Sequence, residues 1–298
     1  MKNFILPFKM IDKLCFINFS LAICLNYVKM VKVMKSKNLW ALILGSSSGF
    51  GEAISIEFAK AGYNIFGVHL DRKNTMPNVG KIIKSIKSMG REVYFFNVNA
   101  ADDGRRRIVI EDIKKITNYK EGVVRIFVHS IAFGTLKPFL SLNDTLENIL
   151  KSQLEMTIDV MANTLIYWVQ DLIRENIMSS GGRIFAMTSA GSQRVWKNYG
   201  AISSAKAALE AHIRQIACEL APLGITANAI KAGVTETPAL MKIPGHKEMI
   251  KLAKEHNPSG RLTQPIDVAK AILALSSEET YWITGNIINV DGGENIAG

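Results

Sequence analysis

Apolar residues recur along the chain in two alternating patterns. Short runs rich in β-branched and aromatic residues predict buried strands, and longer stretches with apolar positions every three or four residues predict helices. The predicted strands span residues 40–44, 64–69, 92–98, 123–129, 183–188, 226–230 and 287–290. The predicted helices span residues 51–61, 79–89, 105–117, about 144–176, about 201–220 and 266–275. This alternation is typical of a parallel sheet, so residues 38–298 are predicted to form a single doubly wound α/β domain with seven strands.

The composition fits a folded domain without a disulfide framework. Of 298 residues, 48% are apolar and 21% are charged, which is too apolar for a disordered chain. The chain has only three cysteines, Cys15, Cys24 and Cys218, which excludes a disulfide scaffold. No Cys-x-x-Cys pair is present, and we expect no metal centre.

The positive charge is concentrated at the amino terminus. The net charge is +10, and residues 1–37 hold seven lysines and one aspartate, which leaves only +4 for the remaining residues. The short run Arg105–Arg107 follows two aspartates at a predicted helix start, where such runs are usually solvated. We therefore expect no nucleic-acid partner.

The amino-terminal stretch contains an apolar run, Leu14–Val28. Its 15 residues fall short of the ~20 that a membrane helix needs, and no small-residue cleavage site follows. We expect no stable membrane insertion and a cytoplasmic protein, with interfacial membrane contact as the alternative. Residues 1–37 are expected to be a disordered extension, or coding sequence upstream of a native start at Met30 or Met34.

A glycine-rich turn follows the first predicted strand. That strand runs into Gly45-Ser-Ser-Ser-Gly49-Phe50-Gly51 and then into a helix, which makes a G-x-x-x-G-x-G loop. Glycines permit positive φ and let the backbone approach a pyrophosphate, and the amino end of the helix supplies unpaired N–H groups. In this strand-to-helix setting the loop predicts the dinucleotide site of a Rossmann fold, and a tight turn without a ligand is the alternative.

The end of the second predicted strand leaves the choice of cofactor open. A carboxylate there binds the adenosine ribose of NAD, whereas a basic group pairs with the 2′-phosphate of NADP. Asp71 lies 20 residues after Gly51, which favours NAD, while Arg72 and Lys73 favour NADP. Either NADH or NADPH is expected, and solvated turn residues are the alternative interpretation.

A serine, a tyrosine and a lysine follow the fifth predicted strand. Tyr199 and Lys206 are seven residues apart, so on a helix of about 100° per residue both side chains lie on one face. Ser189 precedes Tyr199 by ten residues, where the strand ends. A lysine cation stabilises a neighbouring phenolate and so eases proton donation near neutral pH. The three residues are predicted to form an acid for a carbonyl or enolate oxygen.

Residues 38–298 resemble the short-chain dehydrogenase/reductase family over nearly their full length. The resemblance is carried by the glycine loop, by Asn97-Val98, by Ser189 with Tyr199 and Lys206, by the segment Lys231–Thr237 and by the terminal ITGNIINVDGG. It implies a Rossmann fold and a nicotinamide cofactor.

Several positions resemble the enoyl-acyl-carrier-protein reductase branch of that family. Most members place the tyrosine and lysine four residues apart, whereas here Ser203 stands at that lysine position and the spacing is Tyr-x6-Lys. The segment Val128–Phe133 stands where ordinary reductases carry Asn-Asn-Ala-Gly, and it resembles the His-Ser-Ile-Ala/Gly segment of that branch. Asp159 stands where an asparagine usually completes a proton relay, again as in that branch. Ser189 departs from the many enoyl reductases that have a second tyrosine there, and it resembles a less common group that keeps a serine.

The resemblance implies an enzyme that reduces trans-2-enoyl thioesters, carried by acyl carrier protein or coenzyme A, in fatty acid synthesis. Tyr199 would bond the enolate oxygen, Ser189 would place the substrate, and Lys206 would hold the nicotinamide ribose. The cofactor residues that it implies are Gly45, Ser47, Gly49, Phe50, Gly51, Asn97, Val98, Ser130, Ile131, Ala132, Lys206, Gly233, Thr235 and Thr237, beside Asp71 or Arg72. A 3-oxoacyl or other carbonyl reductase is the alternative enzyme, and a non-catalytic dinucleotide-binding regulator is the alternative outside enzymes.

Two further expectations concern a lid and the assembly. Residues 238–258 follow the sixth strand and mix apolar residues with lysines, so we expect them to be a lid that could cover an acyl chain. The family usually forms tetramers through its long helices, which by resemblance implies a homotetramer.

Overall fold

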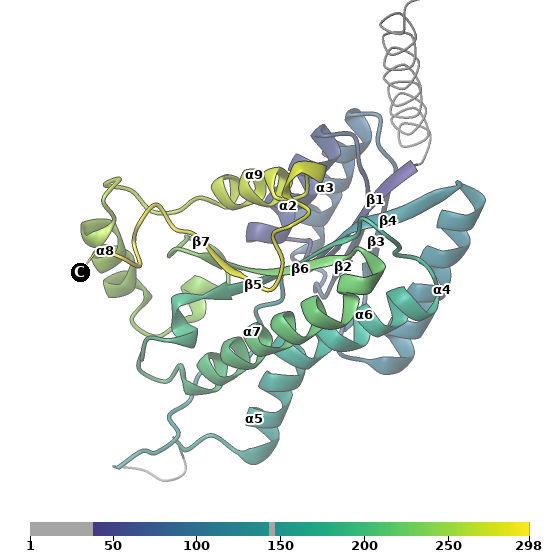
Figure 1. The fold of residues 1–298 in the computed structure, drawn as a ribbon. Helices are drawn as coiled ribbons and strands as arrows, with labels where there is room; N and C mark the ends of the chain where they lie inside the picture. Colours follow the sequence, from purple (N-terminus) through teal and green to yellow (C-terminus); the bar gives the residue numbers. More distant parts are fainter. Residues whose placement is uncertain (1–37, 143–146, 298) are drawn as a thin grey trace, which may run out of the picture. The chain divides into compact units, whose positions relative to one another are not determined.

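A parallel sheet of seven strands lies at the centre of the fold (Figure 1). The computed structural model describes residues 38–142 and 147–297. The strands are β1 (Asn38–Leu44), β2 (Asn64–His69), β3 (Val93–Asn97), β4 (Gly122–His129), β5 (Arg183–Ser189), β6 (Thr226–Ala232) and β7 (Ile287–Val290). Their order across the sheet is β3-β2-β1-β4-β5-β6-β7, which confirms the predicted doubly wound fold. The strand order reverses between β1 and β4, so a ligand crevice is expected at the carboxyl ends of these strands.

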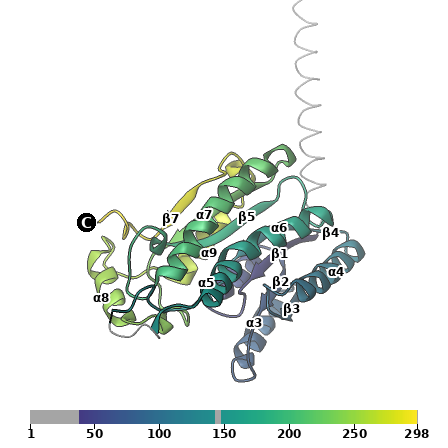
Figure 2. The ribbon, with the colours of Figure 1, turned by 90° about the horizontal axis from the view of Figure 1, so that it is seen from below.

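Helices cover both faces of the sheet (Figures 1 and 2). One face carries α2 (Gly49–Lys60), α3 (Met76–Ser88) and α9 (Pro265–Ala274), and the other carries α4 (Asp103–Tyr119), α6 (Thr164–Arg174) and α7 (Gly200–Leu220). The central strands β1, β2 and β4 are rich in apolar residues because helices cover both of their faces, whereas the edge strand β3 is partly exposed. Phe58 and Ile272 belong to the core of the first face, and Trp168 and Leu209 to the core of the second.

The prediction of one uninterrupted α-helix over residues 144–176 is wrong. Helix α5 (Lys151–Ile158) is followed by a π-helical turn at Asp159–Asn163 before α6 begins. Residue 144, the predicted start, lies outside the described residues. The Thr164 hydroxyl donates to the Val160 carbonyl at 2.9 Å, a side-chain bond that competes with the backbone pattern of an α-helix. Such π-turns are frequent at functional sites, and this one packs against α7.

The structure adds detail to one prediction about an exposed segment and corrects another. The segment 238–258, predicted as a lid, contains a helix, α8 (His246–His256), that the apolar pattern did not reveal. The basic run at the start of α4 is not a fully solvated face, because Arg106 is buried. Its guanidinium donates to Asp171 at 2.8 Å and to Asp103 at 2.6 Å, and this pairing offsets the cost of burying the charge.

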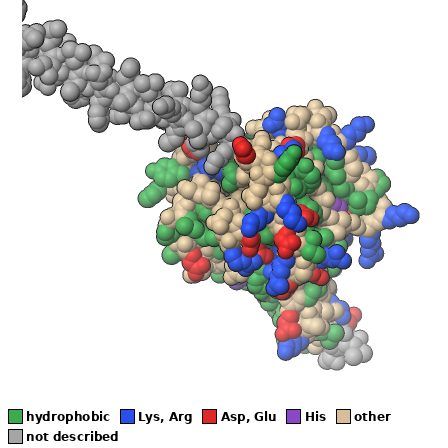
Figure 3. Space-filling model, turned by 90° about the vertical axis from the view of Figure 1, so that its right-hand side faces the viewer, with side chains coloured by type: hydrophobic (Ala, Val, Ile, Leu, Met, Phe, Trp, Pro, Cys, Tyr) green, Lys and Arg blue, Asp and Glu red, His purple; other side chains and the backbone are tan. Residues whose placement is uncertain are grey.

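Charges of both signs share the surface that Figure 3 shows, with Lys and Arg side chains interspersed among Asp and Glu. Within residues 38–142 and 147–297, no helix is long and apolar enough to cross a bilayer. The chain divides into the units Met1–Asn38 and Leu39–Gly298, and the second contains the helices and the site. The extension predicted at residues 1–37 lies outside the described residues.

Candidate active site

Two glycines of the loop between β1 and α2 stand at positions where no side chain fits. Gly45 has a φ of +80°, and a Cβ there would collide with the Ser130 carbonyl oxygen. Gly51 lies in the first turn of α2, where a Cβ would collide with the Gly45 carbonyl. The N-cap residue Ser48 makes no side-chain capping bond, so the first N–H groups of the helix have no cap from that residue. A bare loop in front of an uncapped helix start fits a pyrophosphate.

At the end of β2, Asp71 is held in place by its neighbours. Its carboxylate lies 2.9 Å from His69 Nδ1 and receives hydrogen bonds from Ser47 and Thr75. Partial burial raises the pKa of Asp71, but the hydrogen bonds from Ser47, Thr75 and His69 together bring it below its usual value. Asn97 fixes the same turn, because its side chain accepts from Asp71 N at 2.9 Å and donates to Asp71 O at 3.0 Å. The result is an ionised carboxylate with a fixed position.

The other residues predicted near the adenosine are less constrained. Arg72 and Lys73 are exposed, on the turn that follows Asp71. Val98 is half-buried, and its N–H donates to His69 O at 2.8 Å, which places it beside the same strand end.

The segment after β4 borders the glycine loop. Ser130 N donates to Leu44 O at 3.0 Å, which places Ser130 beside Gly45. Ile131 is half-buried and Ala132 is exposed. These residues therefore lie at the carboxyl end of β4, next to that of β1.

The last residue of β4, His129, is a buried neutral base. Its Nε2 lies 2.7 Å from Thr164 Oγ1, and its Nδ1 has no partner among the described residues. Burial lowers the pKa of His129 to about 3, helped by the charge of Lys206. The Thr164 hydroxyl already donates to Val160, so it accepts the Nε2 proton.

Tyr199 stands at the residue before α7, with its ring against Gly191. A Cβ on Gly191 would lie 2.5 Å from Tyr199 Cε1, so only glycine leaves space for this ring. Asn198, with a φ of +62°, turns the chain into the helix. Burial raises the pKa of Tyr199, and a hydrogen bond with Ser189 at the end of β5 opposes that shift. The pKa of Tyr199 stays raised from its usual value, so the phenol keeps its proton at neutral pH.

Lys206 is buried at the same end of β5. Its Nζ donates to the Met187 carbonyl at 2.7 Å. Burial lowers the pKa of Lys206 to about 8, against the opposing effect of Glu210. The expectation that Lys206 lowers the pKa of Tyr199 is not met, because the ammonium is turned to Met187 and Ser189 is the group that acts on the phenol.

The loop after β6 reaches back to the glycine loop. A Cβ on Gly49 would lie 3.2 Å from Thr237 Cγ2, so the two loops are in contact. Thr235 is buried and donates to Gly233 O at 3.0 Å. A Cβ on Gly233 would lie 2.8 Å from Glu294 Oε2, which brings the carboxyl-terminal tail against this loop.

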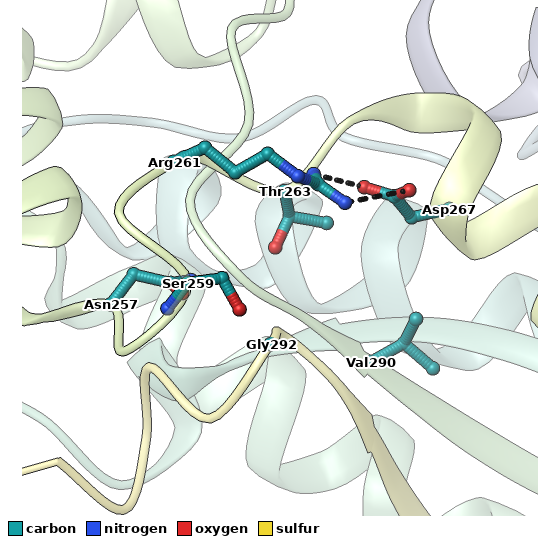
Figure 4. A pocket seen from close by; sticks show the side chains of 7 residues that line it. All are labelled: Asn257, Ser259, Arg261, Thr263, Asp267, Val290 and Gly292. Carbon is teal, nitrogen blue, oxygen red and sulfur yellow. Dashed lines mark hydrogen bonds and ion pairs between the residues drawn. The ribbon is translucent and has the colours of Figure 1, made fainter.

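Two cavities lie beside this site. The smaller, of about 190 Å³, is at the carboxyl end of β7 (Figure 4). In it Arg261 points at Asp267 and donates to both carboxylate oxygens, at 2.6 and 3.1 Å, so its charge is already neutralised. The larger, of about 680 Å³, is lined by Ser48 and Gly49 of the glycine loop and by Pro238 after β6. Neither is lined by the serine, tyrosine and lysine described above.

The structure thus brings the predicted residues together at the carboxyl edge of the sheet. A dinucleotide fits here, because Gly45 and Gly51 of the glycine loop would admit no Cβ and a carboxylate stands at the adenosine end. A protonated phenol at the other end can donate to an oxygen on which charge develops. In the described ranges, no cluster of three or more His, Cys, Asp or Glu side chains could hold a metal ion.

Two side chains of this site were missed in the sequence. His69, which pairs with Asp71, ends a strand that is otherwise apolar apart from Asn64. Glu210 is buried and accepts a hydrogen bond from the Thr188 hydroxyl at 2.7 Å. The available signal for Glu210 was a charge on the apolar face of a helix, one turn after Lys206.

Comparison with known proteins agrees with this geometry. The family model for enoyl-(acyl carrier protein) reductase matches residues 45–295. An enoyl-acyl-carrier-protein reductase (NADH) 2 of Rhizobium meliloti is 30% identical over 220 residues, which cover 73% of this chain and 78% of that protein. A 7alpha-hydroxysteroid dehydrogenase of Escherichia coli is 25% identical over 258 residues, which cover 85% of this chain and 92% of that protein.

A solved structure shows the same fold. The crystal structure of the enoyl-acyl-carrier-protein reductase (NADH) of Aquifex aeolicus superposes with a TM-score of 0.73 at 26% identity, covering 88% of this chain and 98% of that one. The family model covers most of the chain and includes the glycine loop and the serine, tyrosine and lysine. The chain therefore belongs to the short-chain dehydrogenase/reductase family and is an NAD(P)H-dependent oxidoreductase.

Proposed function

We propose that this protein is an enoyl-acyl-carrier-protein reductase, which reduces the double bond of trans-2-enoyl thioesters in fatty acid synthesis. The observation that carries the proposal is the placement of Tyr199 just outside α7, with Lys206 inside it. Ser203, at the position where most members carry their lysine, has no charge to offer. Relative to a four-residue spacing, the tyrosine is set back by about one helical turn, ~5 Å, which changes the angle at which the phenol meets a substrate.

The proposed mechanism is a conjugate reduction. When bound, the nicotinamide cofactor supplies the hydride that adds to the β-carbon of the enoyl group. As the double bond breaks, charge develops on the thioester oxygen, and the Tyr199 phenol donates a hydrogen bond to it. Ser189 holds that phenol and helps to place the thioester, while Lys206 is positioned to hold ribose hydroxyls. A proton delivered to the α-carbon completes the saturated acyl chain.

We further propose that the cofactor is NADH. The Asp71 carboxylate is ionised and held by His69, so it can accept hydrogen bonds from the two adenosine ribose hydroxyls. The 2′-phosphate of NADPH would meet that negative charge. Arg72 and Lys73, the residues that favoured NADPH in the sequence, are exposed beside it.

The test is loss of nicotinamide absorbance with the purified full-length protein. Crotonyl and acetoacetyl thioesters of acyl carrier protein and of coenzyme A are offered in parallel, each with NADH and with NADPH. We expect oxidation of NADH with the crotonyl thioester alone. Oxidation only with the acetoacetyl thioester would make the protein a ketoreductase.

A carbonyl reductase is the second candidate, on one observation. Ser189 hydrogen-bonds the Tyr199 phenol, which is the serine–tyrosine pair of an ordinary carbonyl-reducing member. Relatives named as a hydroxysteroid dehydrogenase and as a tetrahydroxynaphthalene reductase match at 25% identity and support the same alternative. The parallel assay separates the two candidates.

We also propose that the catalytic domain spans residues 38–298, that residues 238–258 form a lid and that the protein is a homotetramer. Exposed apolar side chains just before β7 support an assembly, since Tyr281 is 61% and Trp282 is 85% exposed. Light scattering on the eluted protein tests it. A Trp282→Glu variant is expected to elute as a smaller species if this patch is an interface.

A further inference from the structure

Two charged side chains of α7 are each fixed to a neighbouring residue of β5. Lys206 Nζ donates to the Met187 carbonyl at 2.7 Å, and the Thr188 hydroxyl donates to Glu210 Oε1 at 2.7 Å. Lys206 and Glu210 are only 5% and 6% exposed. They are four residues apart and so share one face of the helix. The ammonium and the carboxylate therefore dock on the same short piece of β5, directly before Ser189.

Within residues 38–142 and 147–297, Glu210 is the acid whose charge acts on Lys206. No carboxylate of these residues comes within 4 Å of the ammonium, so its N–H groups are not blocked by an ion pair. The other titratable groups on the elements around Lys206 form hydrogen bonds with other side chains. His129 of β4 bonds with Thr164, and Asp159 of the π-turn bonds with Tyr167. Lys231 of β6 bonds with Gln193, and Tyr199 bonds with Ser189.

We propose that Glu210 is a positioning residue: its carboxylate, held by the Thr188 hydroxyl, keeps the Lys206 ammonium charged in a buried site beside Tyr199. Lys206 is the group that acts on the cofactor ribose, and Glu210 acts only through it. The inference deepens the proposed function, and the part that concerns substrate turnover rests on it.

The balance of burial and charge supports this role. Burial lowers the pKa of Lys206 to about 8, while Glu210 acts in the opposite direction. Without Glu210, the buried cation loses its counter-charge and gives up its proton at a lower pH. Loss of that cation weakens binding of the nicotinamide ribose, which Lys206 is positioned to hold. The consequence is a pH dependence that a merely structural contact between α7 and β5 does not produce.

The experiment compares pH profiles of Glu210→Gln with wild type between pH 6 and 10. The glutamine keeps the size of the side chain and a carbonyl acceptor for Thr188, and removes only the charge. We expect the alkaline limb of kcat/KM to move to lower pH by about one unit. Thr188→Val, which keeps the carboxylate and removes the hydrogen bond that holds it, is expected to move the limb in the same direction by less than Glu210→Gln does. Glu219→Gln, an exposed acid on the same helix, is expected to match wild type.

An unmoved limb in a folded Glu210→Gln variant overturns the proposal, and so does an equal movement in Thr188→Val. If Glu210→Gln does not fold, as judged by circular dichroism, Glu210→Asp replaces it. Aspartate keeps the charge on a shorter side chain, so the limb is expected to stay within about half a unit of wild type; a movement of a full unit contradicts the proposal.

The pH dependence of NADH binding gives a second readout, followed by NADH fluorescence without substrate. Its alkaline midpoint is expected to fall in Glu210→Gln by the same amount as the limb of kcat/KM. If no thioester is reduced, the proposed function fails while this titration still decides the role of Glu210. An alkaline midpoint that is unchanged by the variant counts against the role whether or not turnover is seen.

Discussion

The two ends of the site hold their groups by different means. At the adenosine end, backbone geometry positions the groups. Gly45 and Gly51 of the glycine loop would admit no Cβ, and Asp71 lies in a partly exposed turn fixed by Asn97 and His69. At the catalytic end, the groups are side chains that burial has removed from water. Lys206 and His129 are both buried, and burial is the largest influence on the pKa of each.

The two ends therefore depend on different physical properties: the adenosine end depends on the shape of the backbone, and the catalytic end depends on the protonation states of its side chains. An anion-binding turn needs close approach and free N–H groups, which a short local sequence provides. Acid chemistry needs protonation states that differ from those in water, which only a low-dielectric environment provides. Changes at the adenosine end should therefore alter affinity and cofactor choice, and changes at the catalytic end should alter turnover and pH dependence.

The largest expected effect is at the catalytic end, in Tyr199→Phe. In the proposed mechanism, loss of the phenol hydroxyl removes the hydrogen bond to the developing enolate, so kcat/KM is expected to fall by about 10²- to 10⁴-fold. NADH affinity should stay at the wild-type value, since the adenosine end is untouched. Tyr281→Phe, at a 61% exposed tyrosine, is the control and should leave both unchanged. A Tyr199→Phe enzyme with full activity would remove this residue from the mechanism.

At the adenosine end the largest effect is expected from Gly51→Ala. The new methyl group would collide with the Gly45 carbonyl and lie 3.1 Å from Ser46 Cα, and both are backbone atoms that cannot turn aside. The loop relieves the clash by shifting away from its binding geometry. If the usual cost of overpacking, about 1–3 kcal/mol, has to be met on binding, the NADH dissociation constant should rise by about one to two orders of magnitude. Gly80→Ala in α3, where nothing lies within 4 Å, should bind NADH as wild type does. Equal binding by both variants contradicts the close-approach argument.

The change in the free energy of unfolding between pH 7 and pH 5 reports on the burial of His129 at the catalytic end. The pKa of His129 is lowered from 6.5 to about 3, so over this range the unfolded chain takes up a proton there that the folded protein does not. Stability is therefore lost as the pH falls below 6.5, by about 2 kcal/mol between pH 7 and 5.

Urea denaturation of wild type and His129→Asn at the two pH values isolates this contribution. The variant should lose about 2 kcal/mol less than wild type over the interval. His256→Asn, at an exposed histidine at the end of α8, is the control and should follow wild type. Parallel losses in wild type and His129→Asn would show that the buried histidine does not stay neutral.

The smallest effect is expected from Asp71→Asn, measured as the ratio of kcat/KM for NADH to that for NADPH. Removing the negative charge relieves repulsion of the 2′-phosphate, so the preference for NADH should shrink by about tenfold, ~1.4 kcal/mol. The maximal rate with NADH should change little, because the catalytic end is unaltered. Asp112→Asn on α4, whose side chain is 46% exposed and far from the cofactor turn in sequence, is the matched control. A preference for NADPH in wild type contradicts the role given to Asp71.

The fold and the adenosine end were largely predictable from the chain. Strand and helix periodicity located all seven strands, because both faces of a covered parallel sheet leave continuous apolar runs. The helix over residues 144–176 was predicted without its π-turn, since no glycine or proline marks the change and the side-chain bond of Thr164 competes with the helix only locally. Helix α8 was missed because it is mostly exposed and only Ala253 in it is buried.

The sequence by itself determined which groups are present and their local spacing: the glycine loop after β1, Asp71 after β2, and Tyr199 seven residues before Lys206. Tertiary structure alone decided which groups act on one another. Thr188 and Glu210 are 22 residues apart, yet they share a hydrogen bond. The protonation states of Lys206 and His129 likewise follow from burial between strands and helices that meet only in the folded chain, because desolvation depends on everything packed around a group and not on its neighbours in sequence.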